Sequence, residues 1–346
     1  MMQADTKQKV LFDFWYASEL PDVAVSLDDY AKKCAGPRLA AILLSTRLTR
    51  ALTMIWFGRR FRLIVPNWYK YGRLICVLQG LLGTRNILLL ECIDYNIASK
   101  GKIIQAIYLV LARHIFGAGM RRSVVRIQVM TEWERRTFVE RFGLFEDMLV
   151  TIRWPMLGWD QPNLEPVRAE AGNYVFSSGR VACDWPTLFR AAEIGGWKLV
   201  VVCSRKDKSL VDHLNERLGA EVHSEVSVAE HNRILARAAV YALALKECSK
   251  SSGQVRLASC IQAEVPVVAS RVRGLDGYAV DGENCVMVDE GEPGQLASSV
   301  RSLLDNPHVA ADLTHRATAQ AAGYSKANYF SEIGSLIESA MFAHPR

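Results

Sequence analysis

The chain alternates short β-branched apolar runs with longer segments whose apolar residues recur every three or four positions. The short runs have the length of buried strands, and the longer segments have the period of amphipathic helices. In the first half we expect strands at Val10–Trp15, Phe61–Val65, Ile87–Glu91, Val124–Met130 and Met148–Ile152. In the second half we expect strands at Tyr174–Ser177, Lys198–Cys203, Ala220–His223, Val240–Leu245, Pro266–Ser270 and Cys285–Val288.

Helical spacing falls between most of these strands, for example at Leu39–Phe57, Tyr71–Leu82 and Lys102–Phe116. One helix has both ends marked, because Thr131 and Glu134 have the spacing of a capping box and Gly143 follows the last turn. Strands that alternate with helices in this way are typical of βαβ units in parallel sheets. We therefore predict an α/β protein with two Rossmann-like domains that face each other across a cleft.

The 346 residues are enough for two domains, each with its own core. Residues 161–172 hold two prolines and a glycine with little apolar periodicity, which is typical of a linker. We therefore expect an N-terminal domain over 1–160, a linker over 161–172, a second domain over 173–323 and a terminal helix over 324–346.

Composition favours a globular protein, since half of the residues are hydrophobic and 23% are charged. There is no signal peptide pattern, and the longest apolar runs have about half the length of a membrane-spanning helix, so we do not expect an integral membrane protein. The eight cysteines and seven histidines lack metal-binding spacing, so we expect no metal site. Cys76, Cys203 and Cys260 lie in apolar runs and indicate buried thiols in a reducing compartment.

Positive charge is concentrated in the first half of the chain. From Tyr30 to Leu90 there are 11 basic residues and no acidic one. Basic residues mixed with Leu, Ile and Trp suit the surface of an anionic membrane, although an ordinary solvated face has the same composition. No helix-turn-helix, zinc finger or RNP-like string accompanies them, so we expect no nucleic acid partner. The residues expected at the membrane or acceptor are Arg59, Arg60, Arg62, Trp68 and Lys70.

The stretch from Ser251 to Val288 carries the most specific pattern. A small polar loop, Ser251-Ser252-Gly253, precedes a helical segment that a serine is placed to cap, and the apolar run Pro266–Ser270 follows. A glycine-bearing loop at a helix N-terminus leaves backbone N–H groups that suit a phosphate.

This stretch resembles the signature region of the retaining GT-B glycosyltransferases of family 4 and their relatives. The matching pieces are Gly253-Gln254, Pro266–Ser270, Gly274, Tyr278 and Asp281–Asn284. The resemblance implies a GT-B fold whose terminal helix returns to the N-terminal domain, a UDP- or GDP-linked sugar donor, retention of configuration, and no cofactor or metal. One departure is that the paired glutamates of that family fall by register at Ser251 and Ser259.

The resemblance also implies roles for residues at the strand ends of the second domain. Arg180 follows a strand and is expected on the donor diphosphate, although it could instead pair with a carboxylate. The second cation of the family falls at Cys183, so Arg205 or Lys206 is expected to supply it. The expected donor-binding residues are Gly179, Arg180, Ser204, Arg205, Lys206, His223, Ser252, Gly253, Gln254, Val255 and Ser259. Asp94 follows a strand of the first domain and is expected with Arg180 as a catalytic residue.

The function we expect is transfer of a sugar from a nucleotide sugar to a glycan or lipid-linked acceptor in cell-surface polysaccharide biosynthesis. The expected location is the cytoplasm, peripheral on the inner face of the cytoplasmic membrane. A non-catalytic glycosyltransferase-like subunit is the alternative that the serines at 251 and 259 favour. A sugar-nucleotide epimerase of the same fold is a further alternative.

Overall fold

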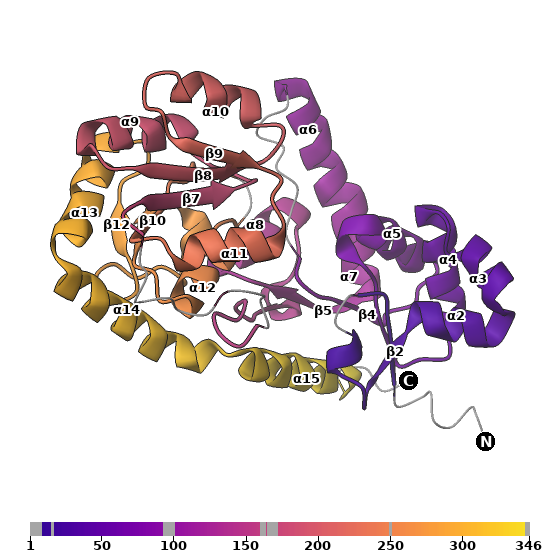
Figure 1. Ribbon diagram of the computed structural model, residues 1–346. Helices are drawn as coiled ribbons and strands as arrows, with labels where there is room; N and C mark the ends of the chain where they lie inside the picture. The colour runs from indigo at the N-terminus through magenta and orange to yellow at the C-terminus, as the bar shows by residue number, and fades with distance from the viewer. Residues whose placement is uncertain are drawn as a thin grey trace. The chain divides into compact units, whose positions relative to one another are not determined.

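The computed structural model describes residues 9–14, 17–92, 101–159, 164, 172–248 and 251–342. The chain divides into two compact units (Figure 1). The first unit comprises residues 1–153 with 330–346, and the second comprises residues 154–329. Each unit holds one six-stranded sheet, and every strand pairing in both sheets is parallel. The predicted α/β class with two parallel-sheet domains is confirmed.

The sheet of the first unit has the strand order β2-β1-β3-β4-β5-β6. Its strands are largely buried runs, as expected where helices cover both faces of a parallel sheet. The short strand β2 was not predicted from the sequence. The strands are β1 (Val10–Phe12), β2 (Ala24–Ser26), β3 (Leu63–Val65), β4 (Ile87–Leu89), β5 (Val124–Val129) and β6 (Leu149–Thr151).

The helices of the first unit are more broken than the sequence pattern predicted. The expected helix Leu39–Phe57 is two helices, because Thr46 forms a reciprocal capping box with Thr49 and starts a new helix. These two helices meet at a bend of 115°. The helices are α2 (Leu27–Ala35), α3 (Pro37–Leu43), α4 (Arg47–Gly58), α5 (Arg73–Leu81), α6 (Lys102–Leu111), α7 (Gly117–Ser123) and α8 (Glu132–Phe142), with π-helical turns η2 (Trp68–Gly72) before α5 and η3 (Ala112–Phe116) between α6 and α7.

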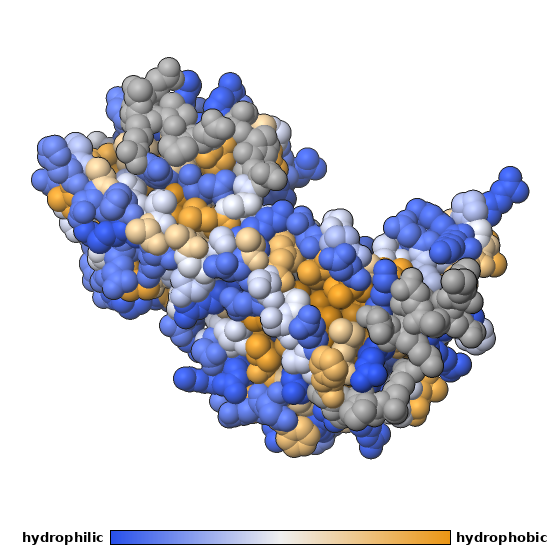
Figure 2. Space-filling model, turned by 90° about the horizontal axis from the view of Figure 1, so that it is seen from below, coloured by the Kyte–Doolittle hydropathy of each residue, from blue (hydrophilic) through white to orange (hydrophobic). Residues whose placement is uncertain are grey.

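Helices α6, η3 and α7 run on as one 22-residue helix, Lys102–Ser123, which by length and composition could cross a membrane. Its C-terminal part is fixed in the core of the unit, because a Cβ on Gly119 would lie 2.9 Å from the Cα of Val77. Helix α6 has no buried residue. Apolar patches also reach the surface on the face shown in Figure 2, between hydrophilic side chains.

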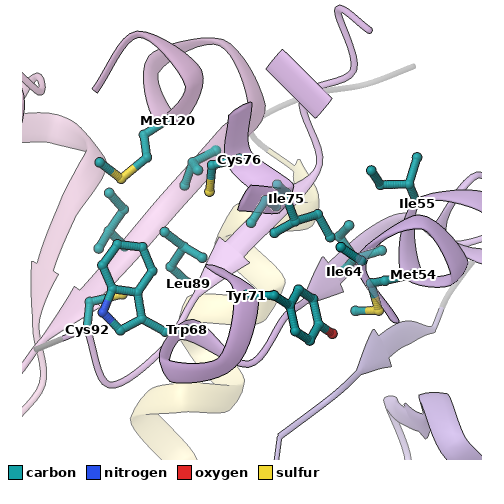
Figure 3. Close-up of a cluster of buried hydrophobic side chains, with 14 of the residues drawn as sticks. Met54, Ile55, Ile64, Trp68, Tyr71, Ile75, Cys76, Leu89, Cys92 and Met120 are labelled. Atoms are coloured by element: carbon teal, nitrogen blue, oxygen red, sulfur yellow. The ribbon is translucent and has the colours of Figure 1, made fainter. Parts of the chain in front are cut away.

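The core of the first unit lies between its sheet and the helices α4, α5 and α7 (Figure 3). Trp68, Tyr71 and Ile75 point from η2 and α5 toward the strand residues Leu89 and Ile64. Trp68 is only 4% exposed and its ring lies 6.1 Å from that of Phe138.

The sheet of the second unit has the order β12-β11-β10-β7-β8-β9. The chain starts at the central strand β7, adds β8 and β9 on one side, and then crosses to β10 on the other. The sheet therefore has its topological switch point between β7 and β10, where α/β proteins bind ligands. All six predicted strands are present: β7 (Val175–Gly179), β8 (Leu199–Cys203), β9 (Glu221–Ser224), β10 (Val240–Leu243), β11 (Val267–Ser270) and β12 (Val286–Val288).

Helices connect and flank these strands. They are α9 (Trp185–Gly195), α10 (Lys208–Asn215), α11 (Val228–Ala236), α12 (Gln254–Gln262), α13 (Pro293–Asp305), α14 (Pro307–Ala321) and α15 (Lys326–Phe342). The predicted serine cap of α12 is wrong: Gly253 is the N-cap and no side chain caps it. The glycine is needed there, since its φ is +98° and a Cβ would lie 2.7 Å from a methyl group of Leu245.

The N-terminal segment of the first unit ends at Arg153, seven residues before the predicted boundary at 160, and residues 330–346 return to this unit. The following segment belongs to the second unit, because the N–H of Trp154 donates to the hydroxyl of Tyr278 (2.7 Å) and the N–H of Met156 donates to the carbonyl of Tyr324 (2.7 Å). The predicted linker 161–172 lies almost wholly outside the described residues.

Candidate functional site

A cavity of about 500 Å³ lies in the second unit at the carboxyl ends of β7 and β8. The loop after β9 and the first turns of α11 and α12 complete it, and Figure 1 shows these two helices beside β7. The cavity is thus at the switch point of the sheet. Its walls comprise Trp154, Trp159, Ser178, Gly179, Arg180, Val202, Cys203, Glu225, Val226, Val228, His231, Asn232, Val255, Arg256, Ala258 and Ser259.

A buried histidine lies in the wall formed by α11. The Nε2 of His231 is 2.7 Å from the Oγ of Ser178, and its Nδ1 is 3.1 Å from the Oδ1 of Asn232. Burial, and next the positive charge of Arg256, lower the pKa of His231 to about 4. The ring is therefore neutral at pH 7. Because Oδ1 of Asn232 only accepts, Nδ1 carries the proton and Nε2 accepts from Ser178.

Arg180 has a carboxylate partner. Its Nη2 lies 3.0 Å from the Oε2 of Glu225, whose Oε1 accepts the N–H of Arg205 at 3.0 Å. The Arg205 N–H and the Arg180 guanidinium hold the pKa of Glu225 below its usual value. Glu225 also has a left-handed φ of +55°, which costs free energy in a residue other than glycine. The carboxylate pairing that the sequence left open for Arg180 is therefore present, although the side chain of Arg180 remains 66% exposed.

Arg256 is a second guanidinium in the same cavity. It extends from the first turn of α12, is half-buried, and makes no hydrogen bond or ion pair with any residue that the structure describes. Burial raises the pKa of Cys183 to about 12, and the positive charges of Lys206 and Arg256 oppose that rise. The family resemblance placed a second cation at Cys183, and Arg256 is a cation in the described lining of the cavity.

Four of the predicted donor-site residues line the cavity: Gly179, Arg180, Val255 and Ser259. Gly179 must be a glycine, because a Cβ there would lie 2.3 Å from the Sγ of Cys183. The hydroxyl of Ser259 donates to the carbonyl of Val255 at 2.9 Å, and the residue is 1% exposed. The hydroxyl hydrogen of Ser259 is therefore already bonded within α12.

The loop before α12 packs against a neighbouring loop rather than lining the cavity. The side-chain amide of Gln254 donates to the carbonyl of Gly274, and a Cβ on Gly274 would lie 2.9 Å from the backbone nitrogen of Ser252. Ser252, Gly253 and Gln254 are thus absent from the described lining of the cavity. Glu247, four residues before Ser251, pairs with Arg273 at 3.3 Å.

The predicted residues on the β8 and β9 ends also lie outside the described lining. Ser204 donates to Asp207 (2.7 Å), and His223 lies 2.7 Å from Glu221. Arg205 reaches the cavity only through its backbone N–H to Glu225, and both Arg205 and Lys206 have exposed side chains.

In the first unit, Arg59, Arg60 and Lys70 are exposed as predicted for a membrane or acceptor surface. Trp68 is buried and therefore does not present its side chain at the surface of the unit. Arg62 is half-buried, and its Nε donates to the carbonyl of Met341 in α15 at 2.8 Å. The predicted catalytic residue Asp94 lies outside the described residues.

Five aromatic or charge-bearing residues are among the lining residues that sequence reasoning missed. Trp154 and Trp159 stack at 5.2 Å with an interplanar angle of 16°, but their segment had been assigned to the first domain. Glu225, His231 and Arg256 carry no motif of their own. A signal was present for Arg256, since it is a cation in the first turn of the helix that the phosphate-binding pattern had already marked.

Among the residues that the structure describes, no group of three or more His, Cys, Asp or Glu side chains is placed to hold a metal ion.

Comparison with known proteins finds similarities over the unit that holds the cavity. Residues 181–306 match the family Glycosyl transferases group 1. A segment of 59 residues is 42% identical to D-inositol 3-phosphate glycosyltransferase 2 of Catenulispora acidiphila. That segment is 17% of this chain and 14% of the relative's length, so the match covers only a small part of the relative.

Similar solved structures cover nearly the whole chain. The structure of HepE from Anabaena in complex with UDP has a TM-score of 0.69 at 15% identity and covers 96% of this chain and 100% of HepE. Sucrose-phosphate synthase from Thermosynechococcus elongatus has a TM-score of 0.66 at 16% identity, over 87% of this chain and 80% of the synthase. The protein therefore has the GT-B fold, and residues 181–306 of its second unit match the Glycosyl transferases group 1 family.

Proposed function

We propose that the protein is a glycosyltransferase that takes a sugar from a nucleotide sugar bound in the cavity of the second unit. The observation that carries the proposal is the pair of guanidiniums, Arg180 and Arg256, in one cavity at the switch point of a parallel sheet. The glycosyltransferase group 1 domain over residues 181–306 supports it. HepE, which has a similar fold, was solved with UDP and with UDP-glucose, which also supports a nucleotide-sugar donor.

The two guanidiniums would bind the diphosphate of the donor. A guanidinium forms charge-assisted, paired hydrogen bonds with phosphate oxygens and keeps its charge at any physiological pH. Sugar transfer leaves negative charge on the departing diphosphate, and cations fixed in advance at that position lower the barrier. Arg180 would exchange Glu225 for a phosphate oxygen, whereas Arg256 has no described partner to release.

The apolar part of the cavity would hold the flat nucleobase. Val226 and Val228 follow β9, and the stacked rings of Trp154 and Trp159 form a wall of the same cavity. Aromatic faces stack well on nucleobases. The donor we propose is UDP- or GDP-linked, with UDP favoured by the ligands of HepE.

The acceptor we propose is a glycan or a lipid-linked sugar in cell-surface polysaccharide biosynthesis. We propose that the first unit binds this acceptor at an anionic membrane surface. The basic stretch from Tyr30 to Leu90 supports that location. We further propose transfer with retention, without cofactor or metal, on the cytoplasmic face of the membrane, as the resemblance of residues 251–288 implies.

A non-catalytic nucleotide-binding subunit is a second candidate. Two observations favour it: Arg180 is already paired with Glu225, and the hydroxyl of Ser259 is bonded within its own helix. Neither Ser251 nor Ser259, where the paired glutamates of the family fall by register, supplies a carboxylate at the donor.

Binding of UDP and GDP to the full chain, measured by calorimetry or ligand NMR, tests the site. We expect Arg256→Gln to weaken UDP binding about tenfold or more, since a hydrogen bond to a charged group is lost. Arg217→Gln is the matched control, because this exposed arginine of the second unit lies outside the described lining. Equal affinity of the Arg256 and Arg217 variants would remove Arg256 from the site.

Incubation with a panel of nucleotide sugars then separates the two candidates. A transferase is expected to hydrolyse one donor slowly even without acceptor. Tight UDP binding with no turnover of any donor, with or without membrane lipid extract as acceptor, would favour the binding subunit.

A further inference from the structure

The outward face of α4 is apolar. Leu48, Leu52 and Trp56 recur every fourth residue and are 52%, 49% and 63% exposed. The opposite face, with Met54 and Phe57, is buried in the core of the first unit. The solvent-facing side of an amphipathic helix in a globular protein is normally polar. The side of α4 that carries Leu48, Leu52 and Trp56 is instead apolar, and the described residues leave about half of it uncovered.

A groove continues this face toward the end of α5. A cavity of about 850 Å³ is lined by residues of α2, α4 and α5, including Leu52, Trp56, Leu81 and Leu82. Leu81 and Leu82 are 75% and 57% exposed. We call Leu48, Leu52, Trp56, Leu81 and Leu82 the apolar face. Single exposed leucines are ordinary, but a joined set of them marks an interaction surface.

Positive charge borders the apolar face. Arg59 and Arg60 line the same groove, and the guanidinium of Arg59 lies 5.7 Å from the ring centre of Trp56. No acidic residue occurs between Tyr30 and Leu90. Tryptophan and arginine at the edge of an apolar surface are typical of the boundary between lipid headgroups and acyl chains. This charge pattern favours an anionic lipid leaflet as the partner.

We infer that the apolar face inserts into the acyl chains of an anionic membrane leaflet, with Arg59 and Arg60 at the lipid phosphates. Helix α4 has 12 residues and is about 18 Å long, against a hydrocarbon core of about 30 Å, so it enters one leaflet and does not cross the bilayer. This goes beyond the electrostatic membrane contact proposed above, because apolar insertion holds the protein when salt screens the charges. It depends on the first unit alone and not on sugar transfer.

Flotation of the full chain with phosphatidylcholine vesicles, with and without phosphatidylglycerol, tests the inference. We expect binding to the anionic vesicles that persists in high salt. The double variant Leu52→Glu/Trp56→Glu is expected to lower the partition coefficient about tenfold or more, because two apolar side chains no longer enter the lipid. Ile194→Glu/Leu210→Glu is the matched control, since these residues of the second unit are 51% and 44% exposed.

A second measurement does not depend on the folding of the double variant. Lipids brominated on their acyl chains are expected to quench tryptophan fluorescence of the bound protein, and Trp56→Phe is expected to remove part of that quenching while binding remains. No change in quenching with Trp56→Phe would overturn the inference.

Two further results would also overturn it. One is complete release of the protein by salt. The other is a dimer in solution that the double variant dissociates, since a second copy would then cover the apolar face. UDP binding is measured on the same samples, so that loss of nucleotide binding with intact insertion counts against the proposed function only.

Discussion

Glu225 places a negative charge at the entrance to a cavity that we propose for a diphosphate. It is held there by Arg180 and by the N–H of Arg205, in a backbone conformation that favours glycine. Such strain is retained where the surrounding contacts enforce it, and it is common at ligand sites. The carboxylate therefore competes with an anionic ligand for Arg180.

Removal of this charge should strengthen nucleotide binding. Glu225→Gln keeps an oxygen for the Arg205 N–H but frees the guanidinium of Arg180, so we expect UDP to bind several-fold more tightly. Calorimetry at constant ionic strength measures the change. Weaker binding would mean that the carboxylate itself contacts the ligand.

His231 should make the stability of the second unit depend on pH. Its pKa of about 4 in the folded protein lies below the ordinary value of 6.5, so the unfolded chain binds more protons between these values. The stabilisation is complete above pH 6.5 and is lost as the pH falls toward 4, by roughly 3 kcal/mol. Urea unfolding at a series of pH values measures it.

His231→Gln is expected to flatten this pH dependence, whereas His213→Gln is expected to leave it unchanged, since His213 is an exposed residue. Parallel curves for all three proteins would show that another group is responsible.

At this scale the sequence supported Arg180 but not Arg256, and the reason is physical. The motif around Gly179 follows a strand, and the carboxyl end of a parallel strand has a known direction. Whether Arg256 points into the cavity or into solvent depends on the rotation of α12, whose residues Leu257 and Ile261 pack in the core. Such packing has no signature in a single sequence.

Among the elements, the described strands other than β2 were predictable, because short apolar runs of four to seven residues have few alternatives. The helices of the first unit were not. Thr46 and Thr49 divide one apolar segment through hydrogen bonds of their own side chains, whereas Lys102–Ser123 continues through two glycines that usually weaken a helix. The same exposed leucines that make α4 unusual look in the sequence like an ordinary buried helix.

The contact between α5 and α7 should tolerate no side chain at Gly119. An added Cβ would meet the backbone of Val77, which cannot move aside, so we expect Gly119→Ala to destabilise the first unit by about 1–3 kcal/mol. Gly334→Ala is the matched control, because no atom lies within 4 Å of its added Cβ, and it should stabilise α15 by up to about 1 kcal/mol. Thermal unfolding of both variants measures these changes in stability. Equal melting temperatures of the Gly119 and Gly334 variants would contradict the tight contact between α5 and α7.

For the whole molecule, the two proposed ligands act on different units. The nucleotide cavity is built from residues 154–259, and the apolar face lies between residues 48 and 82. Hydrogen exchange should therefore separate them: UDP is expected to slow exchange around residues 178–180 and 225–232, and anionic vesicles around α4. Protection of α4 by UDP alone would show that the two sites are coupled.

The cysteines of the protein are all free, and only Cys34 is exposed; it lies in the wall of the groove beside α4. The other seven are buried or half-buried. A polarity-sensitive maleimide dye should consequently attach first at the mouth of that groove in the natural sequence. The emission wavelength of the attached dye would then report when this groove moves from water into the acyl chains of a membrane. No engineered residue would be needed.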